Sequence, residues 1–159
     1  MGADEVGAGF WTISDLHLGH RLVSELRGFA SPDQHDDVIV NNLREILDGA
    51  TLVCLGDISV RRDDEALQRL GELKREKSFR MILVLGNHDR VHPMFGMDSV
   101  REWTPKYREV FDVISFDLQV RIGRWLVLLP HIPRAVGEFV VVDPHQSDKL
   151  ARWAARAGV

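Results

Sequence analysis

Short apolar runs alternate with longer amphipathic segments along the first half of the chain. The apolar runs lie at residues 9–15, 51–57 and 80–87, and each has the length and composition of a buried strand. The segments between them, 31–49 and 63–77, repeat apolar residues at three- and four-residue spacing, which predicts helices. The order strand, helix, strand, helix, strand favours a parallel sheet with helical crossovers.

The ends of both predicted helices carry the expected signals. Ser31 is suited to cap the first helix, Pro32 to its first turn, and Gly49 to its end. The second helix has acidic residues at its start and basic residues at its end, an order that complements the helix dipole.

The second half of the chain has a different pattern. Residues 90–111 are mixed in character, and Pro93 and Pro105 interrupt any long helix, so the pattern predicts a loop with short helical turns. Apolar and polar residues then alternate strictly over 116–122, which predicts a half-buried strand.

A hairpin is predicted next, followed by two further elements. Gly123 and Arg124 can form the turn into a second strand at 125–131. A further strand is predicted at 139–143, and helical spacing of apolar residues predicts a helix within 147–158.

Composition and charge limit the classes of protein. A chain of 159 residues, 45% hydrophobic and 28% charged, predicts a single globular domain over residues 1–159. A net charge of −4 argues against nucleic acid as a partner. No apolar run is long enough to cross a bilayer, and the start does not read as a signal peptide. The single cysteine, Cys54, lies in an apolar run, so we expect a buried thiol in a cytoplasmic protein.

Polar residues with metal-binding chemistry stand at the ends of the predicted strands. They are Asp15 and His17, Asp57, Asn87 followed by His88 and Asp89, and His131. Parallel strands end at one edge of a sheet, so we expect these residues to converge there. Asp15 and His17 are two positions apart and would project to the same side of an extended chain. Carboxylate, imidazole and amide groups together suit divalent metals.

The segments Asp15-Leu16-His17, Gly56-Asp57, Gly86-Asn87-His88-Asp89 and the later His131 resemble the motifs of the calcineurin-like metallophosphoesterase superfamily. Ser14–His20, "SDLHLGH", is similar to its small bacterial and phage members. The resemblance implies an α/β fold, a two-sheet sandwich flanked by helices. It also implies hydrolysis of a small phosphoester, such as a cyclic nucleotide or nucleotide derivative, by hydroxide activated between two metal ions.

The resemblance also implies roles for individual residues. Asp15 and His17 would bind one metal ion, Asp57 would bridge both ions, and Asn87 and His131 would hold the second. Mn²⁺ is the first choice of metal, with Fe, Zn and Ni as alternatives.

His88 and Asp89 are the implied catalytic residues. His88 would contact the substrate phosphate and assist the leaving oxygen. Asp89 would orient His88 by accepting its other ring proton.

The sequence departs from the family pattern after His131, because no Gly-His-x-His follows. Two explanations stay open: the chain is shortened at its C-terminal end relative to the family, or the last ligands are lost. His145 or Asp143 could replace one of them, although a turn explains these residues as well. The alternative to an enzyme is therefore a degenerate member of the fold that acts as a binding scaffold.

Other polar residues are given no firm role. His20 could approach the substrate or simply begin a helix, and His35 and His92 are assigned no function. The arginines after the motif strands could meet phosphates but are more typical of solvated surface charges; they are Arg61, Arg62, Arg90 and Arg134.

Overall fold

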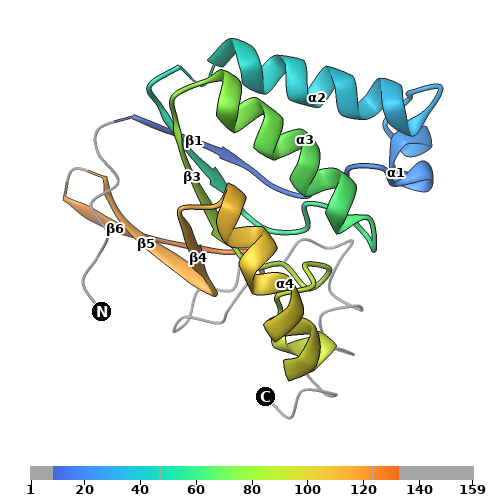
Figure 1. Cartoon of the computed structure of the whole chain (residues 1–159). Coiled ribbons are helices and arrows are strands. Elements are labelled where there is room, and N and C mark those ends of the chain that lie inside the picture. The colour runs from blue at the N-terminus through green and yellow to red at the C-terminus, as the bar shows by residue number, and fades with distance from the viewer. Residues whose placement is uncertain (1–8, 47, 123, 133–159) are drawn as a thin grey trace.

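The computed structural model describes residues 9–46, 48–122 and 124–132, which form a parallel sheet with helices over one face and a two-stranded sheet against the other (Figure 1). The strands are β1 (Phe10–Ile13), β2 (Thr51–Cys54), β3 (Arg80–Val84), β4 (Val113–Ser115), β5 (Asp117–Ile122) and β6 (Trp125–Pro130). The helices are α1 (Arg21–Leu26), α2 (Pro32–Ile46), α3 (Asp63–Glu76) and α4 (Met97–Val110), with a 3₁₀ turn, η1, at Pro93–Phe95.

The first four strands form one parallel sheet in the order β1-β2-β3-β4. Because each strand lies beside the preceding one, right-handed crossovers place all the connecting helices on the same face. Figure 1 shows α2 and α3 lying over that face, with α4 further along it. The mixed α/β fold predicted from the sequence is confirmed.

Two apolar clusters cover the two faces of this sheet. On the helix side, Leu52 and Leu83 pack with apolar residues of α2, α3 and α4, among them Leu43 and Leu70. On the opposite side, the alternate strand residues pack against β5; this cluster contains Val53, Ile82, Val84, Leu118 and Val120. Consecutive side chains of a strand point to opposite faces, so continuous apolar runs are needed to supply both clusters.

The second sheet is the predicted hairpin. β5 and β6 pair antiparallel with Asp117 opposite Pro130 and Ile122 opposite Trp125. Leu118 and Val120 face the core, as the alternating pattern predicts. The strand predicted at 139–143 and the helix predicted within 147–158 lie outside the described residues.

The prediction for residues 90–111 is wrong over most of its length. Instead of a loop with short turns, the segment contains the fourteen-residue helix α4, with Pro105 inside it. Trp103, Tyr107 and Val110 are all buried and lie on one face at helical spacing. Their burial outweighs the loss of one backbone hydrogen bond at the proline.

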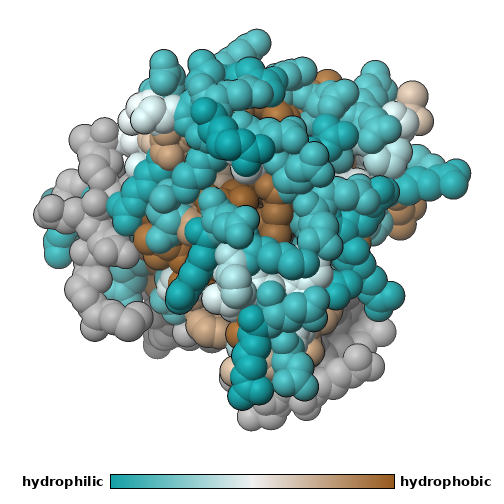
Figure 2. All heavy atoms as spheres, in the orientation of Figure 1, coloured by the Kyte–Doolittle hydropathy of each residue, from teal (hydrophilic) through white to brown (hydrophobic). Residues whose placement is uncertain are grey.

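The outer surfaces of the helices are mostly polar, although Leu22, Leu26, Val38 and Met97 are exposed on them. The face of the molecule in Figure 2 is mostly hydrophilic, with smaller areas of apolar side chains between the polar ones.

The two helices predicted from the sequence form as α2 and α3. Ser31 Oγ caps α2 by accepting a hydrogen bond from the Gln34 amide at 3.2 Å. In the parts of the chain that the structure describes, no helix has the length and apolar character needed to span a membrane.

Candidate metal centre

The loops that follow β1 and β2 continue side by side beyond the sheet. The amides of Asp15, His17 and Leu18 donate to the carbonyls of Gly56, Asp57 and Ile58 at 2.9–3.1 Å. Leu18 and Ser59 form an isolated parallel bridge at the end of this pairing. Backbone hydrogen bonds therefore hold the Asp15–His17 segment beside Asp57.

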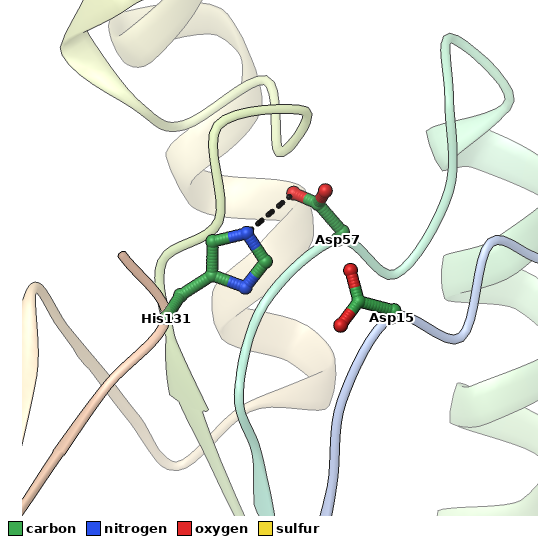
Figure 3. A group of neighbouring side chains, drawn as sticks. All are labelled: Asp15, Asp57 and His131. Atoms are coloured by element: carbon green, nitrogen blue, oxygen red, sulfur yellow. Dashed lines mark ion pairs between the residues drawn. The ribbon is translucent and has the colours of Figure 1, made fainter. Parts of the chain in front are cut away.

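Asp15, Asp57 and His131 form a cluster at this end of the sheet. Each offers one oxygen or nitrogen atom, and these atoms lie within 4.8 Å of one another. Figure 3 shows the three side chains turned toward one another from three separate segments of the chain. His131 reaches the cluster from the end of β6 in the second sheet, and not from the edge of the parallel sheet as predicted.

The His131 ring is fixed by contacts on both nitrogens. Nδ1 lies 2.5 Å from the carbonyl oxygen of Leu55, which can only accept, so Nδ1 carries the proton. Nε2 lies 3.5 Å from Asp57 Oδ1 and 3.3 Å from Asn87 Oδ1. A histidine that donates one ring proton to a backbone carbonyl presents its other nitrogen as a metal ligand.

Asp15 and His17 lie together, but not on an extended chain as predicted. Both have left-handed backbone conformations, with φ of 55° and 48°. His17 Nε2 is 3.5 Å from Asp15 Oδ1. The hydrogen bond from His17 holds the pKa of Asp15 low, at about 2, and the Ser14 hydroxyl and the charge of His131 also lower it, while burial opposes them. Asp15 is thus held in its ionised form.

Two glycines bring the backbone close to Asp57. A Cβ atom at Gly86 would lie 2.1 Å from Asp57 Oδ1 and 2.4 Å from its amide nitrogen. A Cβ atom at Gly56 would lie 2.5 Å from the Gly86 backbone and 2.7 Å from His131 Nδ1. Glycine is required at both positions because a side chain would fill the space that Asp57 and His131 occupy.

The predicted orientation of His88 by Asp89 is wrong. The Asp89 carboxylate is fully buried and accepts from the amides of Gly86 at 2.7 Å, Ile58 at 3.0 Å and Asp57 at 3.1 Å. Burial raises the pKa of Asp89 to about 7, and the hydrogen bonds from Gly86 and Ile58 work against that rise. Asp89 therefore ties the loop after β3 to the loop after β2, because unpaired buried amides would be costly.

His88 lies at the open side of the cluster. Its amide donates to Asp57 Oδ1 at 2.8 Å, and its Nε2 is 4.0 Å from Asp57 Oδ2. The side chain is 43% exposed, and its ring is 6.0 Å from that of His17. His20 caps α1 through Nδ1, which accepts from the Val23 amide, and its ring is 5.9 Å from that of His17. His88 can thus reach both solvent and the cluster.

The donor set fits divalent cations. Asp15, Asp57 and His131 converge, with the His17 ring beside Asp15 and the Asn87 amide oxygen beside His131, and this combination of groups suits metals of intermediate softness. Within the described residues, no lysine or arginine forms an ion pair with Asp15 or Asp57. The buried Nδ1 atom of His17 also has no hydrogen-bond partner there. Adjacent carboxylates and an unpartnered imidazole nitrogen are features that a bound cation would balance.

The remaining candidates are only partly described. His145, Asp143 and Arg134 lie outside the described residues. Arg90 does not extend freely into solvent: its Nε is 3.8 Å from the buried Asp63 carboxylate and its guanidinium covers the Trp103 ring.

Sequence reasoning missed a group of residues behind the Asp15–His17 loop. Arg27, His35 and Asp36 contact one another and the loop backbone. A signal was present, because the helical period that buries Val40 and Leu43 extends back to Asp36 and places it on the buried face. For Arg27, which precedes that helix, the sequence carries no comparable signal.

Comparison with known proteins gives one family. A family model described as calcineurin-like phosphoesterase matches residues 9–153. The Gene 66 protein of Mycobacterium phage D29 is 36% identical over an alignment of 152 residues, which covers 92% of this chain and 71% of that protein. The Gene 66 protein of Mycobacterium phage L5 is 32% identical over an alignment of 149 residues, which covers 88% of this chain and 70% of the length of that phage protein. The family match includes every residue that the structure brings to the cluster.

Proposed function

The chain belongs to the calcineurin-like phosphoesterase family, as its motifs predict, and from this premise we propose that it is a metal-dependent phosphodiesterase. The observation that carries the proposal is the cluster of Asp15, Asp57 and His131, whose ligand atoms lie within 4.8 Å of one another. The proposed substrates are small phosphodiesters such as cyclic nucleotides or nucleotide derivatives.

Five side chains would hold two divalent ions. Asp15 and His17 would hold one ion, Asn87 and His131 would hold the other, and Asp57 would serve both. Asp57 suits this role because it is 3% exposed and faces both His131 and His88. We take Mn²⁺ as the first metal to test, with Fe, Zn and Ni as alternatives. When bound, such ions make water more acidic and withdraw negative charge from phosphoryl oxygens.

His88 is the proposed catalytic residue of the chain. Its exposed ring beside Asp57 is suited to hydrogen-bond a phosphate oxygen and to donate a proton to the leaving alkoxide. The bond from phosphorus to the leaving oxygen breaks as the oxygen of water bonds to phosphorus; the water gives up a proton to solvent, and the leaving oxygen takes one from His88. Asp89 has no ring contact with His88 to support a catalytic role, so we assign it the positioning of the Asp57 backbone.

A scaffold function is the second candidate, because the sequence lacks the Gly-His-x-His that would complete both ligand sets. Metal content of the purified protein separates the two. The phosphodiesterase is expected to hold close to two equivalents after loading with Mn²⁺, whereas a scaffold that has lost its ligands is expected to hold almost none.

Hydrolysis of a chromogenic bis-aryl phosphodiester tests the proposal directly. We expect turnover to require Mn²⁺, to exceed that of the corresponding aryl phosphomonoester, and to disappear in Asp57→Asn. His88→Asn should retain the metal and lose roughly 10²–10⁴-fold in kcat on a cyclic nucleotide, whose alkoxide leaving group needs a proton, and much less on the aryl ester, whose phenolate does not. Asp64→Asn, which changes an exposed acid paired with Lys106, is the matched control and should keep wild-type turnover. Turnover without metal, or full activity of Asp57→Asn, would reject the proposal.

A further inference from the structure

The loop that carries Asp15 and His17 adopts a conformation that needs external support. Both residues have positive φ, a region that residues other than glycine seldom occupy. Such a conformation persists only where surrounding contacts determine it. The pairing with residues 56–58 supports one side of the loop, and the other side faces α1 and α2.

Arg27, at the end of α1, contacts this other side. Its Nη2 donates to the carbonyl oxygen of Asp15 at 2.8 Å, and its Nη1 donates to that of Leu16 at 3.3 Å. One planar guanidinium thus fixes two successive carbonyls, including that of a proposed metal ligand. A lysine ammonium could not reproduce this two-pronged arrangement.

His35 fixes the guanidinium in turn. Its ring is fully buried in α2, and its Nε2 lies 2.9 Å from Arg27 Nη1. Arginine can only donate, so Nε2 is the acceptor and the ring proton is on Nδ1. That proton is donated to Asp36 Oδ1 at 2.8 Å. The imidazole therefore connects a donor on α1 with an acceptor on its own helix.

Asp36 holds the loop backbone on the C-terminal side of His17. Its second oxygen, Oδ2, accepts from the Gly19 amide at 2.8 Å, and its side chain is almost completely buried. Arg69 from α3 approaches the same oxygen at 3.8 Å. His17 is thereby bracketed, with Arg27 holding the backbone before it and Asp36 holding the backbone after it.

We propose that Arg27, His35 and Asp36 act as one positioning relay that holds Asp15 and His17 in their metal-binding conformation. The inference rests on the proposed function. None of the three touches the proposed ions or the substrate, so their effect passes through the loop backbone. Groups that orient metal ligands in this way commonly affect metal affinity by about 10–100-fold.

Arg27→Ala is the variant that best tests the relay. Arg27 is exposed, so its removal leaves the apolar core intact. Asp36→Asn is the second variant, because it keeps the shape of the side chain and removes its charge. Leu43→Ala is the matched control: it lies on the same helix as His35, belongs to the apolar core, and its side chain has no polar atom that could take part in the hydrogen bonds to the loop.

Two measurements are made on each protein in full length. The first is the Mn²⁺ dissociation constant by calorimetry, and the second is hydrogen exchange of the Gly19 amide in the metal-free protein. We expect Arg27→Ala and Asp36→Asn to weaken Mn²⁺ binding by about 10-fold or more. In Asp36→Asn the Gly19 amide should also exchange faster. Leu43→Ala should lower Tm and leave the dissociation constant within about twofold of wild type.

The outcomes separate the relay from the proposed function. Wild-type Mn²⁺ affinity in Arg27→Ala and Asp36→Asn would overturn the relay alone. Equal weakening in Leu43→Ala would also overturn it, because the effect would then be general destabilisation. Absence of Mn²⁺ binding in the wild-type protein would overturn the proposed function, and the relay with it.

Discussion

Asp89 is the residue whose contacts most clearly connect folding with the candidate metal centre. Its buried carboxylate accepts from three backbone amides in two loops, and one of those amides belongs to Asp57. Each residue of the motif Gly86-Asn87-His88-Asp89 therefore has its own role. Gly86 lets the backbone approach Asp57, and Asn87 is a proposed metal ligand. His88 is the proposed proton donor, and Asp89 accepts the hydrogen bonds that join two loops. Each position follows from a different physical requirement.

Asp89→Asn should lower the free energy of unfolding by about 1–3 kcal/mol, because the amide keeps one acceptor oxygen and turns donors toward buried N–H groups. It should also weaken Mn²⁺ binding, since the backbone of Asp57 loses its support. Denaturant unfolding and calorimetry measure the two effects. Asp98→Asn, at a fully exposed carboxylate, is the control and should change the stability by less than about 0.5 kcal/mol. Unchanged stability of Asp89→Asn would contradict the loop-joining role.

At the residue scale, chemistry was easier to predict than conformation. The proximity of Asp15 and His17 was expected from their spacing, but the left-handed backbone that produces it was not. Aspartate and histidine occupy positive φ more often than most residues other than glycine, but this preference is too weak to predict the conformation, which contacts such as the pairing with residues 56–58 support. The partners of Asp89 were missed for a similar reason: they are backbone amides, which nearly every residue has, so the residue types do not show which amides Asp89 accepts from.

Among the secondary-structure elements, α4 is the one that local sequence signals misjudge. Pro105 lacks the N–H that would donate to the carbonyl of residue 101, and a proline there disfavours a helix. The three buried residues of its inner face provide the opposing free energy. β1, β2, β3, β5, β6, α2 and α3 were predictable because their apolar periods and end signals agree. The short elements α1 and β4 were not predicted, because each is too brief to show a period of its own.

Pro105→Ala should stabilise the protein by about 1–3 kcal/mol, since alanine restores the missing backbone donor and removes the steric clash. Urea unfolding monitored by circular dichroism measures the change. Arg101→Ala, an exposed position on the same helix, should lie within about 0.5 kcal/mol of wild type. Destabilisation by Pro105→Ala would mean that the restricted backbone of the proline is needed for packing of Trp103 and Tyr107.

On the scale of the whole molecule, the two apolar clusters share the strands of one sheet. Residues Leu52 and Val53 are neighbours in β2 and serve opposite clusters, so neither cluster can come apart while the other stays intact. The sequence predicted one domain over residues 1–159, and we propose on this basis that the chain unfolds as one unit.

Thermal unfolding should accordingly give one transition that Mn²⁺ shifts upward. At a free Mn²⁺ concentration of about 100 times the dissociation constant, the native state gains about 2.7 kcal/mol, which raises Tm by roughly 5–10 °C. Chelation with EDTA should reverse the shift, and Asp57→Asn should abolish it. Two separate transitions would contradict unfolding of the chain as one unit. A Tm that does not change when Mn²⁺ is added would contradict a metal site in the folded state.

The most direct measurement of the central claim is anomalous diffraction from crystals soaked with Mn²⁺. The account predicts two anomalous peaks at the ends of β1, β2 and β3, one beside Asp15 and His17, the other beside Asn87 and His131, with the carboxylate of Asp57 bound to both. A crystal that takes up Mn²⁺ elsewhere, or binds none while these side chains are ordered, would contradict it.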